Sequence, residues 1–338
     1  MNLWIATLVA IAPVLCFLAG LLWLDGYKLL RPSAVALALA AGVGVALVSY
    51  GFASLLLHNL DMERVTYSRY VAPITEELLK ALVIVALIRA SRIGFLVDGA
   101  IYGFAVGSGF ALFENLHYLK IAQDAGLATW IVRGFGTAIM HGGTTALFTV
   151  MALTVLARRP SAGAAAYVPG LLVASLMHGA FNHLGHMPQV ATLVIVVLVP
   201  TALLVAFHLG ERALSQWLGS GFDKDAEMLE LITEGDFASS PPGAYLAALK
   251  RNLEGPMVAD ILCYLRVYTE LSLRAKGLLM MRESGFVAEG MDEDTKARFD
   301  ELRYLEDSIG SAGMRAMQPL MHMSRQDLWQ LYVLEKSR

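Results

Sequence analysis

Cysteine is scarce in this chain, which has only two among its 338 residues. Cys16 lies in the first apolar segment and Cys263 in the polar C-terminal part, so we expect them to lie far apart in the folded protein. No CxxC pair is present. The sequence therefore excludes a disulfide framework and a CxxC metal or redox site.

Several signatures of membrane-embedded hydrolases are also missing. There is no HExxH motif, which excludes a site-2-type zinc helix. No glycine is followed two residues later by serine, which excludes a rhomboid-like or nucleophile-elbow serine. Asp98 is the only aspartate deep inside an apolar segment, so a two-aspartate site of the presenilin type is excluded as well.

Charge is sparse and apolar residues dominate. Charged residues make up 16% of the chain and hydrophobic residues 57%, with a mean hydropathy of +0.57. This composition predicts a polytopic membrane protein, since a span needs about 20 apolar residues. Seven segments qualify: 3–24, 33–57, 70–88, 94–119, 129–156, 165–184 and 190–209. The first has no Lys or Arg ahead of it and is about twice the length of a signal-peptide core, so we expect a retained helix.

The charge is divided unevenly along the chain. Residues 1–210 carry 11 Lys and Arg against 8 Asp and Glu, whereas residues 211–338 carry 15 against 21. We therefore expect a transmembrane domain at 1–210 and a soluble, acidic domain at 211–338.

Helical periodicity runs through the C-terminal part. It predicts helices at 256–282, 292–309 and 326–334, with Pro256 at the first start and Gly285 past its end. No phosphate loop, metal spacing or basic stripe occurs there, so no nucleic-acid partner is expected. The fold class is thus all-α: a helical membrane bundle of about seven spans, followed by a soluble helical module for regulation or partner binding.

The loop charges predict an orientation through the positive-inside rule. Alternate connections hold six basic residues and the opposite connections hold three. The six are Lys28, Arg31, Arg89, Arg92, Arg158 and Arg159, and the three are Arg64, Arg69 and Lys120. We expect the N-terminus outside and the C-terminal domain in the cytoplasm.

Six ionisable residues stand inside the expected spans. A charge at the bilayer centre costs roughly 2.5–3.5 kcal/mol on insertion scales, so packing alone is a poor explanation for several of them. They are Glu76, Glu77, Lys80, Glu114, His141 and His178, with Asn182 one helical turn after the last. We expect them to share one site.

The spacing indicates how these residues divide their roles. Glu76 and Lys80 are four residues apart and share a helix face, whereas Glu77 points about 100° away. One carboxylate can therefore pair with the lysine while the other faces the bundle. His178 and Asn182 also share a face, so Asn182 can orient His178 or donate to a developing oxyanion.

Two kinds of water activation fit this set, and both stay open at the level of sequence. Carboxylates and imidazoles are suitable zinc ligands, which makes Glu77, Glu114, His141 and His178 a candidate metal site. Without a metal, a buried glutamate can act as general base, with His and Asn supporting the oxyanion.

Two functions other than hydrolysis are also compatible with these residues. An ion- or proton-coupled transporter could use the same residues as a relay. It is disfavoured because they form one cluster and no pair of broken helices is evident. A scaffold without activity is least favoured, since buried ionisable groups are expensive to keep.

Glycine recurs every fourth residue at Gly99, Gly103 and Gly107. Small residues let helices approach closely in lipid. A homodimer contact is one interpretation. Packing inside the chain, which would let Glu114 reach the bundle interior, is the favoured one.

The motifs together resemble the PrsW family of intramembrane proteases, within the wider group of CAAX prenyl endopeptidases and bacteriocin-processing enzymes. The matching elements occur in order over roughly residues 65–190. They are Glu76-Glu77-x-x-Lys80, Phe110-x-x-x-Glu114, His141 and His178-x-x-x-Asn182. Glutamate at the second motif is typical of the PrsW branch, whereas the CAAX branch has histidine.

The resemblance implies an activity and a setting. The first-motif glutamates, Glu76 and Glu77, would activate water, and Glu114 and His141 would position it or bind metal. His178 with Asn182 would support the oxyanion. The implied substrate is a membrane-anchored protein such as an anti-sigma factor, cleaved in the lipid bilayer of a bacterial inner membrane, with zinc as the expected cofactor.

Overall fold

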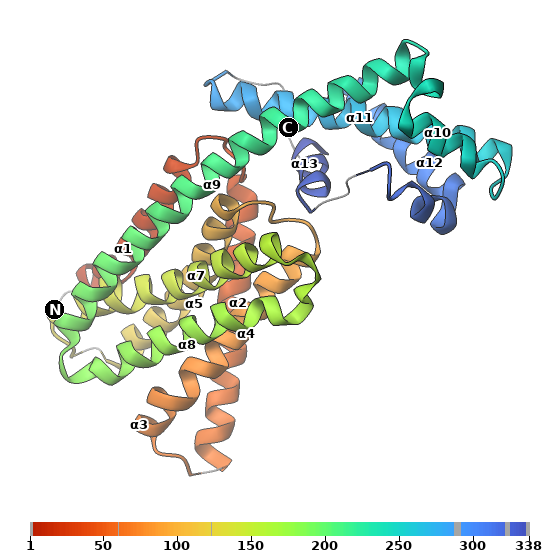
Figure 1. Ribbon diagram of the computed structural model, residues 1–338. Helices are drawn as coiled ribbons and strands as arrows, with labels where there is room; N and C mark the ends of the chain where they lie inside the picture. The colour runs from red at the N-terminus through yellow and green to blue at the C-terminus, as the bar shows by residue number, and fades with distance from the viewer. Residues whose placement is uncertain (1–2, 60, 123, 287–291, 322–324, 336–338) are drawn as a thin grey trace. The chain divides into compact units, whose positions relative to one another are not determined.

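The protein is all-helical in the computed structural model, which describes residues 3–59, 61–122, 124–286, 292–321 and 325–335 (Figure 1). Over those residues it contains no strand. The chain divides into two compact units, residues 1–212 and 213–338. The all-α prediction is confirmed.

Among the described residues, seven longer helices build the first unit, joined by short helices and helical turns. The longer ones are α1 (Leu3–Leu24), α2 (Pro32–Asn59), α4 (Ala72–Arg89), α5 (Leu96–Ile121), α7 (Ala138–Arg158), α8 (Val168–His183) and the start of α9 (Pro188–Thr233). The short ones include α3 (Arg64–Thr66) and α6 (Leu127–Ile131).

Six helical segments among the described residues are long and apolar enough to cross a membrane. The sequence predicted about seven, and the difference is the segment at 70–88. This segment forms α4, but Glu76, Glu77 and Lys80 make the helix too polar to be counted among the apolar membrane-crossing helices. Helix α9 continues through Gly210, near the boundary expected between the two domains.

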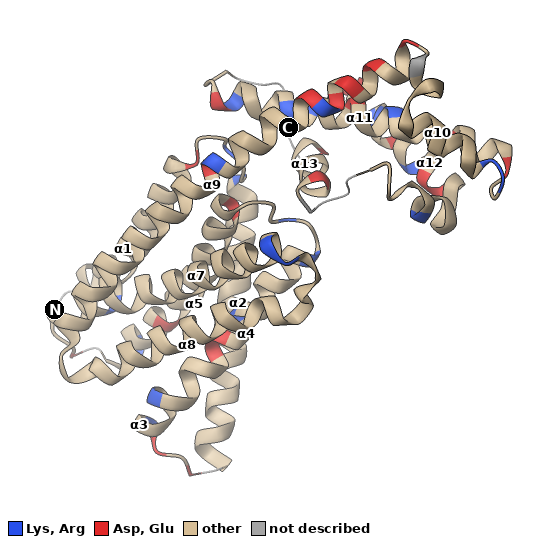
Figure 2. Cartoon of the chain, in the orientation of Figure 1, with Lys and Arg blue, Asp and Glu red and all other residues tan. Residues whose placement is uncertain are grey.

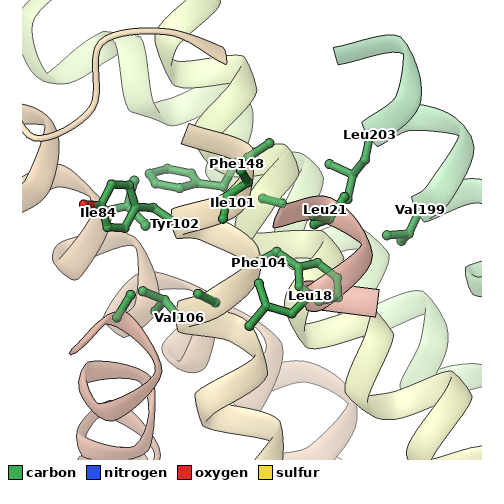
Figure 3. Packing of buried hydrophobic residues seen from close by; sticks show 14 of the residues in the cluster. Leu18, Leu21, Ile84, Ile101, Tyr102, Phe104, Val106, Phe148, Val199 and Leu203 are labelled. Atoms are coloured by element: carbon green, nitrogen blue, oxygen red, sulfur yellow. The ribbon is translucent and has the colours of Figure 1, made fainter. Parts of the chain in front are cut away.

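Helix α5 is the central element of the membrane unit. Every residue from 97 to 111 is buried, and α5 packs against α7, α2 and α1. Figure 3 shows the core around it, where Phe104 and Ile101 of α5 lie among side chains of α1, α7 and α9. An apolar helix buried on all sides is expected at the centre of a bundle.

The glycines of α5 let α7 approach closely within the same chain. A Cβ on Gly103 would lie 2.7 Å from the Cα of Ala146, and one on Gly107 would lie 2.1 Å from the carbonyl oxygen of His141. Glu114 follows Gly107 by two turns and therefore stands on the same face, towards α7. The interpretation of packing inside the chain is confirmed for this face.

Two site-bearing helices begin in π-helical turns. Residues Tyr67–Val71 (η1) lead into α4, and Val132–Thr137 (η2) lead into α7. Such turns are rare and occur frequently at functional sites. Asp98 caps the N-terminus of α5 by accepting hydrogen bonds from the backbone N–H groups of Gly94 and Phe95.

The second unit contains the three helices predicted for the polar part of the chain, as α11 (Gly255–Glu283), α12 (Glu293–Met317) and α13 (Arg325–Glu335). It also contains α10 (Pro241–Leu249), which was not predicted. Gly285 has the positive φ expected past the end of α11, and α12 kinks at Gly310, where the prediction ended it. Charged residues are frequent on these helices and sparse along the membrane helices (Figure 2).

Candidate active site

Helix α4 carries a buried ion pair at its core. Lys80 Nζ lies 2.6 Å from Glu77 Oε1, and both side chains are almost completely buried. The spacing had placed Glu76 on the helix face of Lys80 and had left open which carboxylate pairs with the lysine. The structure pairs Lys80 with Glu77 because both point inward, while Glu76 lines a cavity.

The same carboxylate also orients His178 on α8. His178 Nδ1 lies 2.8 Å from Glu77 Oε1. A carboxylate only accepts hydrogen bonds, so Nδ1 carries the proton and Nε2 keeps its lone pair. That Nε2 lies 4.0 Å from Glu76 Oε2. Histidines that bind a metal through one ring nitrogen usually donate the N–H of the other nitrogen to such a carboxylate.

His141 on α7 lies between Lys80 and Glu114. Its Nδ1 is 3.2 Å from Lys80 Nζ, and its Nε2 is 3.1 Å from Glu114 Oε2. An ammonium group only donates, so Nδ1 accepts and Nε2 donates to Glu114. The ring meets that of His178 edge to face, with centroids 4.8 Å apart. Helices α4, α5, α7 and α8 therefore converge here, as the order of motifs predicted.

Three of these groups are close enough to hold one metal ion. Single ligand atoms of Glu76, His141 and His178 all lie within 4.8 Å of one another. The donor chemistry fits a divalent metal: a carboxylate facing the cavity and an imidazole with a free Nε2. Binding through Nε2 would place the imidazole proton of His141 on Nδ1 and leave the Glu114 carboxylate unprotonated.

The candidate metal set from the sequence was Glu77, Glu114, His141 and His178. In the structure Glu77 lies behind His178 and bonds to its Nδ1, and Glu114 bonds to His141. Glu76 occupies the place facing both imidazoles. Neighbouring glutamates cannot be told apart by sequence, because their roles depend on the rotation of α4 in the bundle.

Asn182 has a different partner from the one expected. Its Nδ2 donates to the backbone carbonyl of Ser68, 2.8 Å away in η1. Backbone hydrogen bonds are shifted by one residue in the π-helical turn. Asn182 of α8 supplies a hydrogen bond to the Ser68 carbonyl in this turn. Asn182 therefore ties α8 to the approach of α4, while it also lines the cavity.

Arg133 is a site residue that the motif analysis did not single out. It belongs to η2, and its guanidinium Nη2 lies 3.2 Å from Glu114 Oε1. A signal was available: it is the one basic residue inside the expected span 129–156. An arginine there needs a partner for the same energetic reason as the glutamates.

A cavity of about 970 Å³ opens onto this cluster. It is lined by Glu76, Glu114, His141 and His178. Residues of α2 also line it, namely Ala46, Ser49, Tyr50, Ala53 and Ser54. Tyr50 packs against His117 of α5, with ring centroids 4.8 Å apart. The volume and the convergent polar groups are those of a ligand-binding site.

The helical bundle and the buried Glu/His cluster together define a polytopic membrane protein with a candidate active site. The model of the PrsW family intramembrane metalloproteases matches residues 30–207, and the chain belongs to this family. No match was found among curated proteins or among solved structures. The protein is therefore an intramembrane protease and an integral membrane protein, and the transporter alternative is not favoured.

Proposed function

We propose that Glu76, Glu77, Glu114, His141 and His178 form the catalytic centre that hydrolyses a peptide bond of a membrane-anchored protein. The observation that carries this proposal is the meeting of Glu76, His141 and His178 within 4.8 Å. These groups line a cavity large enough for a peptide segment. Burial would strengthen the electrostatic interactions made there with a developing charge.

Glu76, His141 and His178 would hold the metal, with zinc as the best match to one carboxylate and two imidazoles. A zinc ion bound there supplies Lewis-acid activation of water and of the scissile carbonyl. Glu77 holds the His178 ring in position, and Lys80 neutralises Glu77. Glu114 is then the cavity-facing carboxylate left to accept the proton of the attacking water. In a mechanism without metal, Glu76 would be that base.

The substrate is proposed from the family and the cavity together. A segment anchored in the bilayer would lie along the wall formed by α2, with its scissile bond at the Glu/His end. Regulated cleavage of an anti-sigma factor-like protein in a bacterial inner membrane is the role that family membership favours. The acidic C-terminal unit would select or regulate that substrate.

The test compares cleavage in native membranes. Membranes that contain the wild type or Glu76→Gln are incubated, and new protein N-termini are mapped by mass spectrometry. We expect new termini within or beside membrane segments with the wild type and none with the variant. Equal sets of termini from both proteins would refute the proposal.

Orientation is proposed from the loop charges alone, with the N-terminus outside and the C-terminal unit in the cytoplasm. Cys263 is exposed in α11 and can report the side on which that unit lies. In a Cys16→Ser background, we expect an impermeant thiol reagent to label Cys263 in inverted vesicles only. Labelling from the outer face of intact cells would reverse the orientation.

A further inference from the structure

Arg133 occupies a position where an unpaired charge would be costly. It lies in η2, in an otherwise apolar segment, and only 12% of its side chain is exposed. A cation at such a place is kept only when its partners compensate for lost hydration. The contacts of Arg133 therefore indicate what it does.

Three side chains that contact Arg133 come from one turn of α5. Its Nε donates to Asn115 Oδ1 at 2.9 Å, and its Nη2 forms the ion pair with Glu114 Oε1 at 3.2 Å. Its guanidinium carbon lies 3.7 Å from the ring centroid of Tyr118, so the cation also covers an aromatic face.

These contacts divide the two oxygens of Glu114 between two partners. Oε1 faces Arg133, and Oε2 lies 3.1 Å from His141 Nε2. A carboxylate held at one oxygen cannot rotate freely, so the contact at Oε1 determines where Oε2 points. In this way the guanidinium sets the direction from which Glu114 meets His141 and the cavity.

Asn115, which accepts from Arg133, is itself held by a hydrogen bond to α1. Asn115 Nδ2 donates to the backbone carbonyl of Ala10 in α1 at 2.7 Å, and Asn115 is fully buried. Arg133 thus donates to an amide side chain that cannot move without breaking a buried hydrogen bond.

We propose that Arg133 is a positioning residue, which holds Glu114 Oε2 towards His141 and the cavity during peptide-bond hydrolysis. The expected effect on kcat rests on the proposed function, whereas the positioning of Glu114 by Arg133 does not. Arginine is required because its planar fork reaches Asn115 and Glu114 together and stacks on Tyr118. A lysine offers one compact charge and cannot make all three contacts.

The positioning is tested without an activity assay, by ¹⁵N NMR of histidine-labelled full-length protein in lipid. His141 and His178 signals are assigned with alanine variants. We expect Arg133→Gln to shift the His141 Nε2 signal, because Glu114 is released, and to leave the His178 Nδ1 signal in place. Arg158→Lys, at the exposed end of α7, is the control. An unchanged His141 signal in Arg133→Gln would overturn the proposal.

The kinetic consequence is measured on a membrane-anchored segment identified by the N-terminal mapping described above. For Arg133→Lys we expect kcat to fall by about tenfold or more with KM within about twofold, the pattern of a lost transition-state interaction. In a Glu114→Gln background the same change should lower the residual rate no further, because Arg133 acts through Glu114. An equal loss in both backgrounds would assign Arg133 a purely structural role. If Glu114→Gln cleaved at the wild-type rate, the proposed role of Glu114 in the reaction would fail, whereas the NMR result would still decide the positioning.

Discussion

His178 Nδ1 and Glu77 Oε1 lie 2.8 Å apart, although 101 residues separate them in the sequence. The same oxygen accepts from Lys80 Nζ at 2.6 Å. One carboxylate oxygen thus joins α4 to α8 and neutralises a lysine that is completely buried. Glu77 is a structural member of the site, whereas its neighbour Glu76 faces the cavity.

The two neighbouring glutamates should respond differently to the same substitution. Glu77→Gln removes the charge that pairs with Lys80, and breaking a buried pair from one side costs about 3–5 kcal/mol. We expect a marked drop in the thermal midpoint of the detergent-solubilised protein. Glu76→Gln, which breaks no close ion pair, should keep the midpoint within a few degrees while cleavage is lost. Equal midpoints for both variants would contradict the assignment.

Metal dependence should follow the cluster of Glu76, His141 and His178. We expect about one zinc ion per chain in the purified protein, measured by mass spectrometry, and its loss in His178→Ala. A chelator should abolish cleavage and added zinc should restore it. Met187→Ala, a change at an exposed position, serves as the control for metal content. If the wild type holds no metal and chelators have no effect, Glu76 acts as general base instead.

Filling the cavity from α2 should impair substrate binding. Ala53 lines the cavity, so Ala53→Leu reduces the room along the α2 side of it. We expect a higher KM for segments with large side chains, with little effect on segments with small ones. Ala36→Leu makes the same change at an exposed position of α2 outside the cavity and should behave as the wild type. A KM that is equally raised for all segments would argue against a pocket that selects by size.

Stability at alkaline pH should depend on Tyr264 in α11. Burial, helped by the nearby Glu306 carboxylate, raises the pKa of Tyr264 to about 12. Its phenol ionises near pH 10 in the unfolded chain, so the unfolded state has fewer bound protons between about pH 10 and pH 12. The contribution to the free energy of unfolding is therefore complete below about pH 10 and is lost as the pH rises through this window.

The measurement is the thermal midpoint of the full chain as a function of pH, followed by tryptophan fluorescence. Tyr264→Phe should weaken the decline above about pH 10, because phenylalanine cannot ionise. Tyr304→Phe, at an exposed position of α12, should leave the decline unchanged. Identical profiles for wild type and Tyr264→Phe would show that the buried phenol does not contribute.

Several features of this protein are local in origin and could be read from the sequence. The apolar runs predict the helices, because each satisfies its own backbone within the segment and its length must match the bilayer. The order of Glu76-Glu77, Glu114, His141 and His178 on successive segments indicated one shared site. The turn at Gly285 followed from the ease with which glycine adopts positive φ.

Other features depend on how the helices are rotated and where they cross. Lys80 pairs with Glu77, Asn182 bonds to Ser68, and Arg133 reaches Glu114. Each partner choice depends on a fraction of a helical turn, and π-helical turns precede α4 and α7. The sequence determined which chemical groups enter the membrane. The tertiary structure decided which of them face the cavity and which hold the others in place, because a buried charge takes the partner that packing brings within reach.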